Sequence, residues 1–248
     1  KSLPKGLREA WLNGSWGGFE GQFFPEFDYE VHTLPDFVPD AHMRRVCAID
    51  YGLDMLAALF VAVDEKGEAY VYEVYKSGLV VSAAAREILA KADGVDTFLA
   101  PSDLWSRQKD SGRSMAELFS DNGVYLTKLS SERIQGWSCL KEWMKVYTEP
   151  DGSKHSALHI LRRCTNLIRC LPLLLYDRSK PGDAAVQPHE ITHAPDALRY
   201  FAASRVGYSA VSPQTAENKR LAAVLLPERE KRRKRCLKQR KKADGTIG

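Results

Sequence analysis

The chain has 248 residues, of which 44% are hydrophobic and 27% are charged. This length suits one good-sized domain with extensions, or two small domains, and the apolar content is sufficient for a core. No apolar run approaches the length of about 18 residues that a membrane-spanning helix needs. The first residues, KSLPKGLREAW, lack the apolar core of a signal peptide. We therefore expect no membrane partner. Because the first residue is Lys, we expect a fragment of a longer protein.

The charged residues are unevenly distributed along the chain. Residues 217–248 hold 12 of the 36 Lys and Arg side chains and 4 of the 32 Asp and Glu side chains, so the remaining 216 residues carry 24 basic and 28 acidic groups. A mildly acidic body with a strongly basic tail indicates a polyanionic partner, most often a nucleic acid. The five cysteines are an odd number without a CxxC motif, which favours a reducing, intracellular compartment.

The first part of the chain predicts an irregular lead-in followed by three strands. Residues 1–44 are rich in aromatic residues, Gly and Pro, and we expect the end of a helix over residues 5–13 and then an extended segment that wraps a larger body. β-Branched and aromatic runs follow at residues 45–51, 56–64 and 69–76. The DEKG tetrapeptide before the third run is a turn in which Gly supplies a positive φ. Short links between successive strands predict an antiparallel meander.

Beyond the meander, predicted helices alternate with predicted strands. Turn residues and apolar spacing divide this part of the chain, and Ser82 is a candidate helix cap. The predicted helices are 82–93, 114–122, 132–147, 162–171 and 195–205, and the predicted strands are 97–100, 124–127, 145–148 and 157–160, with a hairpin turn at 149–152 between the last two. This order predicts an α/β fold with a mixed sheet covered by helices. Polar and basic composition beyond residue 209 predicts a disordered tail.

Three aspartates lie where predicted elements end or begin. Alternation along the first strand places Asp50 at the strand end, on the face shared by Val46 and Ala48. Asp103 follows a buried strand, at the end where open α/β sheets bind their ligands. If the first and fourth strands are neighbours, these two carboxylates face each other. Asp196 lies directly after a proline in the predicted first turn of a helix, where the helix dipole favours a carboxylate.

Carboxylates in such positions are costly unless they are paired, protonated or bound to a cation. Two of them about 4 Å apart repel by roughly 4 kcal/mol at an effective dielectric constant of about 20. A convergent trio therefore predicts a site for Mg²⁺ or Mn²⁺, and a pair of such ions suits hydrolysis of a phosphodiester. His193 is a candidate extra ligand or proton carrier, and Glu73 is a candidate fourth acid. Each aspartate alone has an ordinary explanation as a cap, turn former or first-turn acid, so the prediction rests on their combination.

At these residues the chain resembles a known family. The lead-in WLNGSWGGFEGQFFPEF, the VCAIDYG strand, the SERIQGW helix start and the HAPDALRY ending are similar to the C-terminal nuclease domain of the large terminase subunit of tailed bacteriophages. The resemblance covers nearly the whole chain; the DALRY ending is a fairly specific motif, whereas DYG alone is weak. It implies a ribonuclease-H-like α/β fold, in which three antiparallel strands and then parallel strands form a mixed central sheet flanked by helices, with a β-hairpin insertion.

The resemblance also implies roles for individual residues. Asp50, Asp103 and Asp196 would be the catalytic metal ligands, His193 would be a further ligand, and the cofactor would be two ions of Mg²⁺ or Mn²⁺. The family often carries an acidic residue directly before this histidine, where the present chain has Thr192. A role for such an acid is therefore in doubt here.

The implied activity is metal-dependent endonucleolytic cleavage of double-stranded, concatemeric viral DNA during genome packaging in the host cytoplasm. A β-hairpin around residues 148–160 would lie beside the active site and guide or restrict the DNA. The candidate DNA contacts, each of which is also explained as a solvated charge, are Arg107, Lys109, Lys128, Arg133 and Lys154.

The same resemblance implies how the chain is divided. Residues 1–44 would be a linker that trails an ATPase motor, residues 45–208 the nuclease domain, and residues 209–248 the basic tail. The motor would precede residue 1 in the full-length protein, whose other partners would be the small terminase subunit and the portal. The chain itself contains no GxxxxGK[ST] phosphate-binding loop.

Two other classes of function fit the same residues. A junction resolvase or transposase-like nuclease of the same fold would also use an acidic cluster, and a strong preference for four-way junctions would distinguish it. A non-catalytic DNA-binding or portal-docking module would depend on the basic tail instead. In that case truncation near residue 209 would abolish DNA binding, and no metal-dependent cutting would be seen.

Overall fold

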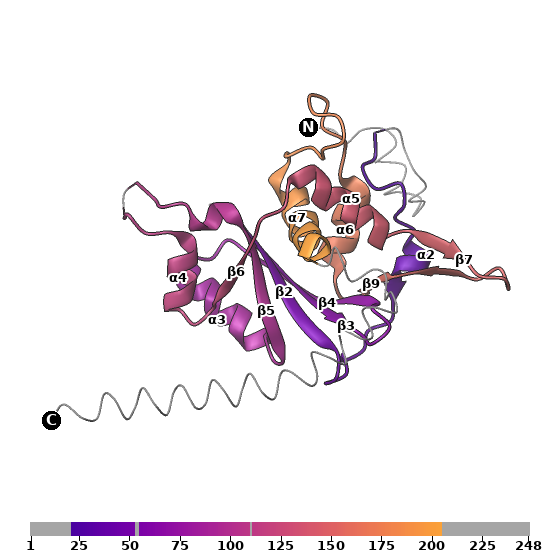
Figure 1. Cartoon of the computed structure of the whole chain (residues 1–248), viewed down its shortest axis with the longest axis horizontal. Helices are drawn as coiled ribbons and strands as arrows, with labels where there is room; N and C mark the ends of the chain where they lie inside the picture. Colours follow the sequence, from indigo (N-terminus) through magenta and orange to yellow (C-terminus); the bar gives the residue numbers. More distant parts are fainter. Residues whose placement is uncertain (1–20, 53–54, 110, 205–248) are drawn as a thin grey trace, which may run out of the picture. The chain divides into compact units, whose positions relative to one another are not determined.

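The computed structural model describes residues 21–52, 55–109 and 111–204 (Figure 1). The helix end expected over residues 5–13 and the tail expected beyond residue 209 lie outside the described residues. Within the described part, no helix combines the length and apolar character needed to cross a membrane.

A mixed β-sheet forms the centre of the fold. Among the described residues it has seven strands in the order β1-β9-β4-β3-β2-β5-β6. The pairs β2–β3 and β3–β4 are antiparallel, and the other neighbouring pairs are parallel. The predicted meander and mixed sheet are therefore confirmed. The strands are β1 (Thr33–Leu34), β2 (Arg44–Tyr51), β3 (Leu56–Val63), β4 (Ala69–Ser77), β5 (Val95–Pro101), β6 (Leu126–Leu129) and β9 (Leu158–Leu161).

The register of the sheet brings the C-terminal ends of β2 and β5 to one edge. Asp50, near the end of β2, pairs with Ala57 on β3. Ala48 pairs with Leu99 on the parallel strand β5, and β5 continues to Pro101. Residues that directly follow β5 therefore lie at the same edge of the sheet as Asp50. The first and fourth predicted strands are thus neighbours, which is the condition for Asp50 and Asp103 to lie at one edge.

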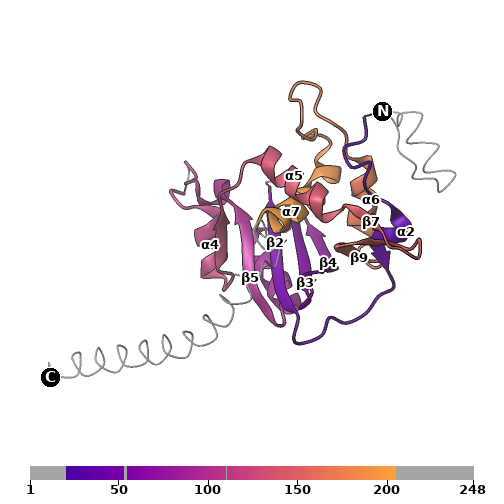
Figure 2. The same cartoon turned by 45° about the vertical axis from the view of Figure 1, so that its right-hand side comes forward.

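Helices cover both faces of the sheet, with α5, α6 and α7 on one side and α3 and α4 on the other (Figures 1 and 2). Alternation along the strands explains the two layers. Ala48 and Leu59 join the core beneath α7, whereas Ile49 and Phe60 pack against α3. The helices are α3 (Val81–Lys91), α4 (Met115–Asp121), α5 (Arg133–Trp143), α6 (Thr165–Leu173) and α7 (His189–Ser204).

Two helix starts differ from the sequence-based expectation. α7 begins at His189, so Pro195 lies inside the helix instead of opening it. Most residues in the middle of α7 are buried. The free energy gained from packing these residues outweighs the loss of the one backbone hydrogen bond that a proline inside a helix causes. Ser82 does not cap α3, which starts after Val80 without a side-chain cap. The start of α4 is as predicted, because Ser114 caps it in a capping box.

The predicted hairpin exists but uses different residues for its second strand. β7 (Val146–Thr148) pairs with β8 (Lys154–Ser156), and Gly152 has a φ of +85° in the turn between them. The second strand of the hairpin is predicted at residues 157–160, but Leu158–Leu161 form β9 and pair with β4 of the main sheet. A run of apolar residues fits this central position better than it fits a solvent-exposed hairpin.

The described part of the N-terminal segment belongs to the same core. Phe23, Phe24 and Phe27 are buried, and the first two rings contact Trp137 of α5 edge-on. The short helix α2 (Tyr29–His32) and β1 follow, and β1 extends the sheet by pairing with β9. Residues 21–34 thus pack as part of the domain, and the sheet begins before residue 45.

Candidate active site

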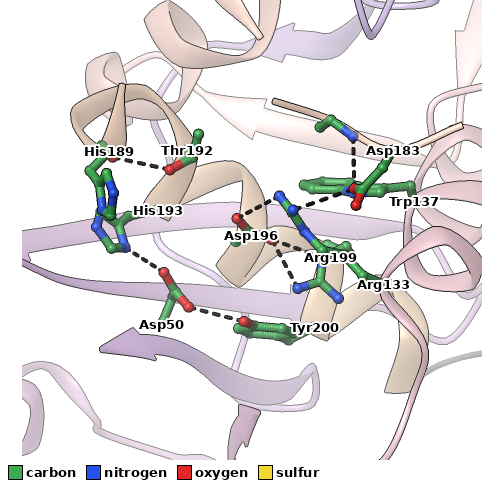
Figure 3. Close-up of polar contacts among 11 residues, drawn as sticks. Asp50, Arg133, Trp137, Asp183, His189, Thr192, His193, Asp196, Arg199 and Tyr200 are labelled. Atoms are coloured by element: carbon green, nitrogen blue, oxygen red, sulfur yellow. Dashed lines mark hydrogen bonds and ion pairs between the residues drawn. The ribbon is translucent and has the colours of Figure 1, made fainter. Parts of the chain in front are cut away.

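Asp50 lies at the end of β2 and points toward α7, as the alternation of Val46, Ala48 and Asp50 predicts. Two side chains of α7 bind its carboxylate (Figure 3). The Tyr200 hydroxyl donates to Oδ1 at 3.0 Å, and Nδ1 of His193 lies 2.5 Å from Oδ2. The carboxylate is thus held at both oxygens by one helix that comes from the far end of the sequence.

Helical periodicity brings the reactive side chains of α7 to one face. His193, Asp196 and Tyr200 are spaced by three and four residues, which places them on the same side of an α-helix. The helix begins two turns before Asp196, so a helix dipole at the first turn does not explain the charge of this residue. Two guanidinium groups bind its carboxylate instead. Nε and Nη2 of Arg199 lie 2.9 Å from Oδ1, and Nη2 of Arg133 lies 3.4 Å from Oδ2.

Burial and neighbouring charges shift the protonation of this site. Burial raises the pKa of the Asp196 carboxyl; the charge of Arg199 opposes this rise, and the charge of Asp50 adds to it. Burial, followed by the negative charge of Asp50, also raises the pKa of Tyr200. Tyr200 therefore keeps its proton at neutral pH and acts as a hydrogen-bond donor.

A second layer of contacts holds the two arginines. Asp183 accepts a hydrogen bond from Nε1 of Trp137 at 2.9 Å and lies 3.4 Å from Nη1 of Arg133. The guanidinium of Arg199 lies over the Trp137 ring, with Cζ 5.0 Å from the ring centroid. Gly136 of α5 directly faces Arg199. The arginines thus occupy fixed positions between α5 and α7, as Figure 3 shows.

Asp103 lies at the same edge of the sheet but in a different environment. It follows β5 in the short 3₁₀ helix η1 (Ser102–Trp105) and is exposed, unlike Asp50 and Asp196. His193 and Tyr200, which lie on either side of Asp196 along α7, bind Asp50. The register of β2 and β5 places Asp103 at the same edge of the sheet. The assignment of the three aspartates as catalytic metal ligands stays a prediction.

The structure weakens one sequence-based argument, namely that this trio needs a cation to stay ionised. Arg199 and Arg133 already place positive charge within 2.9 and 3.4 Å of Asp196, and Tyr200 donates to Asp50. Glu73, considered as a fourth acid, pairs with Lys91 of α3 at 3.2 Å on the opposite face of the sheet. It does not join the site.

The five basic residues proposed to bind DNA lie in three places. Arg107 and Lys109 are exposed in the loop that follows η1, and Lys128 of β6 lies 5.8 Å from the Trp105 ring centroid. Arg107 and Lys109 thus follow Asp103 closely along the chain, and Lys128 pairs with Ala100 of β5, just before Asp103. Arg133 is held between Asp183 and Asp196. Lys154 lies on β8.

The β7–β8 hairpin lies away from this site, contrary to the expectation from the resemblance. His155 of β8 contacts Glu68, which precedes Ala69 at the start of β4. Ala69 pairs with Val63, and Val63 pairs with Arg44 at the start of β2. Because Asp50 lies near the Tyr51 end of β2, the base of the hairpin is at the opposite end of the sheet, roughly 20 Å along the strands.

Sequence reasoning missed Tyr200, Arg199, Trp137 and Asp183. The first two belong to the DALRY motif, and their spacing from His193 and Asp196 along a helix is the signal that could have identified them. The roles of Trp137 and Asp183 depend on how α5 docks, for which the local sequence carries no comparable signal.

Comparisons with known proteins give matches in structure only. No protein-family model and no curated protein matches the chain. The nuclease domain of the bacteriophage P22 large terminase has a TM-score of 0.59 at 18% identity, over 77% of this chain and 94% of that one. The large terminase nuclease of thermophilic phage G20c, with bound magnesium, has a TM-score of 0.51 at 15% identity, over 77% and 99%.

The large terminase of a second thermophilic bacteriophage is similar over a part of its length. Its TM-score is 0.58 at 15% identity, and the match covers 73% of this chain and 45% of that protein. The present chain thus spans about half the length of that large terminase. Together with the mixed sheet and its two helical layers, these matches show that the chain has the ribonuclease-H-like fold of large terminase nuclease domains.

Proposed function

We propose that this chain is a divalent-metal-dependent endonuclease that cleaves double-stranded, concatemeric DNA during viral genome packaging. The observation that carries the proposal is that α7, the helix that contains Asp196, binds Asp50 through His193 and Tyr200 at the edge of the sheet where β5 leads to Asp103. The fold shared with large terminase nuclease domains supports the same function.

The donor groups at this edge fit a hard divalent cation. Asp50, Asp103 and Asp196 offer carboxylate oxygens, the ligands that Mg²⁺ and Mn²⁺ prefer, and His193 offers an imidazole. Asp50 and Asp196 are partly buried. Burial and the charge of Asp50 both raise the pKa of Asp196, and a bound cation would oppose that rise. The similar G20c nuclease has been solved with magnesium and with cobalt. A pair of such ions, when bound, supplies activation of a water molecule and stabilisation of the leaving oxygen.

The side chains of this chain have distinct roles in the proposal. Tyr200 and His193 fix the orientation of the Asp50 carboxylate by binding one oxygen each. Arg199 holds Asp196 through two nitrogens, and its charge opposes the rise in the pKa of Asp196 that burial causes. His193 is placed to hold or pass a proton at Nδ1.

The exposed cations beside Asp103 would position the DNA. Arg107, Lys109 and Lys128 reach solvent at this edge of the sheet, and lysine and arginine contacts to phosphates carry no base specificity. Each neutralised phosphate makes the slope of log affinity against log salt more negative by about 0.9. This arrangement suits cleavage with little sequence preference.

A plasmid-nicking assay tests the proposal with a matched pair of variants. Asp50→Asn removes one carboxylate charge at the site, whereas Glu73→Gln makes the equivalent change on the opposite face of the sheet. We expect wild type and Glu73→Gln to nick or linearise plasmid with Mn²⁺ or Mg²⁺ and to be inactive with a chelator. We expect Asp50→Asn to be folded and inactive. Undiminished cutting by Asp50→Asn would refute the proposed site.

A substrate comparison and a tail truncation separate the competing functions. A strong preference for four-way junctions over linear duplex would favour a resolvase or transposase-like enzyme. No metal-dependent cutting, together with loss of DNA binding on truncation near residue 209, would favour a binding or docking module. We extend the proposal to the whole protein, in which an ATPase motor, the small terminase subunit and the portal would be partners in the host cytoplasm.

A further inference from the structure

A second group of metal-ligating side chains lies at the opposite end of the sheet from Asp50. Glu68 precedes β4, His155 lies on β8, and His159 lies on β9. One carboxylate oxygen and one ring nitrogen from each histidine all lie within 4.8 Å of one another. Three separate segments of the chain therefore converge on one point, and none of them contributes to the proposed active site.

The distances within the group are close to those of a transition-metal site. Nε2 of His155 lies 3.0 Å from Oε1 of Glu68, and Nε2 of His159 lies 3.5 Å from Oε2. Ligand atoms at about 2.0–2.1 Å from a tetrahedral Zn²⁺ ion lie about 3.3 Å from one another. The His155 side chain is 41% exposed, whereas that of His159 is 9% exposed. The ligand atoms lie within 4.8 Å of one another, so binding an ion requires them to approach to about 3.3 Å, and the more exposed His155 is the ligand with room to move.

Tyr70 holds two of the three ligands in place. Its hydroxyl lies 2.9 Å from Oε2 of Glu68 and donates to it, and its ring stacks on that of His159 with centroids 5.2 Å apart. Asp64 adds a further carboxylate, which accepts the backbone N–H of Glu68 at 2.9 Å. Such outer contacts orient the ligands of metal sites, and the extra negative charge favours a cation.

From this geometry we propose that Glu68, His155 and His159 bind a divalent transition-metal ion of the Zn²⁺ class, which ties the β7–β8 hairpin to the main sheet. Two imidazoles and one carboxylate suit Zn²⁺ rather than Mg²⁺, which prefers oxygen ligands. Three protein ligands leave a further position, on the exposed side of His155, for water. Because the ligands come from β8, β9 and the turn before β4, the ion cross-links segments that are distant in sequence.

The competing explanation is a hydrogen-bonded cluster without a metal. In that case both imidazoles donate an N–H to the Glu68 carboxylate, and the group needs no ion. The two explanations differ in the affinity for zinc, because a hydrogen-bonded cluster gains nothing from added Zn²⁺. They also differ in the response to Glu68→Gln, since an amide can still accept hydrogen bonds but is a poor zinc ligand.

Calorimetric titration of the full chain with ZnCl₂, in millimolar Mg²⁺ to saturate the carboxylate site, tests the proposal. The variants are Glu68→Gln, His155→Gln and the control His42→Gln, which removes an exposed histidine elsewhere. Wild type and the control should bind the same number of zinc equivalents. The other two variants should lose one equivalent or bind it at least about tenfold more weakly. Equal stoichiometry and affinity in all four proteins would overturn the proposal.

Thermal unfolding provides a second measurement that does not depend on catalysis. Zn²⁺ should raise the Tm of wild type and of His42→Gln, and should leave the Tm of His155→Gln unchanged, because a ligand stabilises only the state that binds it. His155 is partly exposed, so its replacement should leave the metal-free protein folded. An equal zinc-induced shift in His155→Gln would contradict the site. Neither result bears on DNA cleavage, so this inference and the proposed function stand or fall separately.

Discussion

The packing of α5 against α7 depends on the absence of a side chain at Gly136. A Cβ atom added there would lie 2.8 Å from Cγ of Arg199 and 3.2 Å from its Cδ. Arg199 is buried, and its guanidinium lies against the rings of Trp137 and Tyr200. It also binds Asp196 through two nitrogens, so it has little room to move. We therefore expect Gly136→Ala to displace the guanidinium that neutralises Asp196.

Two effects oppose each other in this variant. Ala is favoured over Gly in a helix interior by about 1 kcal/mol, whereas forcing extra atoms into a packed interior typically costs about 1–3 kcal/mol. Weakening the buried ion pair between Arg199 and Asp196 adds to the cost. We therefore expect the free energy of unfolding to fall by about 1–3 kcal/mol, although helix propensity alone would raise it.

Urea unfolding measures this change, with Ser138→Ala as the control. Ser138 lies on the same helix, is exposed, and donates only to the carbonyl of Ile134 one turn earlier. Its replacement should change the free energy of unfolding by no more than about 0.5 kcal/mol. If Gly136→Ala is as stable as wild type or more stable, the close approach of Arg199 to α5 does not restrain it, and the argument fails.

Three further measurements probe the site and the core. Tyr200→Phe removes one hydrogen bond to Asp50. Plasmid nicking should slow, while the free energy of unfolding should change by only about 0.5–1.5 kcal/mol. An unchanged cutting rate would contradict the role of Tyr200 in orienting the Asp50 carboxylate. Trp137→Phe removes a buried donor to Asp183, so urea unfolding should show a loss of about 1–3 kcal/mol; a neutral effect would mean that water replaces the indole. Burial raises the pKa of Cys164 to about 12, so this thiol stays protonated at pH 8. It should therefore react with an aromatic disulfide reagent only when the protein unfolds. Rapid reaction of Cys164 in the native protein would show that the thiol is accessible.

The sheet and one side of the site could be predicted because local patterns specify them. Alternation of Val46, Ala48 and Asp50 assigns the face of β2, and the position of Asp103 after a strand assigns the edge of the sheet. Both inferences need only the two-residue period of a strand and the tendency of ligands to bind where strands end.

The start of α7 could not be predicted from local preference. Proline favours the first turn of a helix, which led to an expected start at Pro195. The observed start at His189 depends on burial of the helix between the sheet and its neighbours, a tertiary effect that outweighs the proline preference. The correct start also changes the physics of Asp196, whose charge is balanced by side chains and not by the helix dipole.

The partners of Asp196 were unpredictable for a related reason. Arg133 is 63 residues away along the chain, and on sequence alone it is indistinguishable from a solvated charge or a DNA contact. Its role follows from the docking of α5, which also brings Trp137 to Asp183. The hairpin was misplaced because residues 158–161 are apolar enough to enter the main sheet, which moves the paired strand to β8.

The charges around the two partly buried aspartates, Asp50 and Asp196, determine which ligands a cation would meet first. Asp196 already has two guanidinium groups within 3.4 Å, whereas Asp50 is bound by a neutral hydroxyl and an imidazole. Asp50 and the exposed Asp103 are therefore the carboxylates that a cation can use without competition from arginine. Use of Asp196 as well requires Arg199 or Arg133 to give up part of its ion pair. The affinity of this third carboxylate for a cation thus depends on how closely α5 packs against α7.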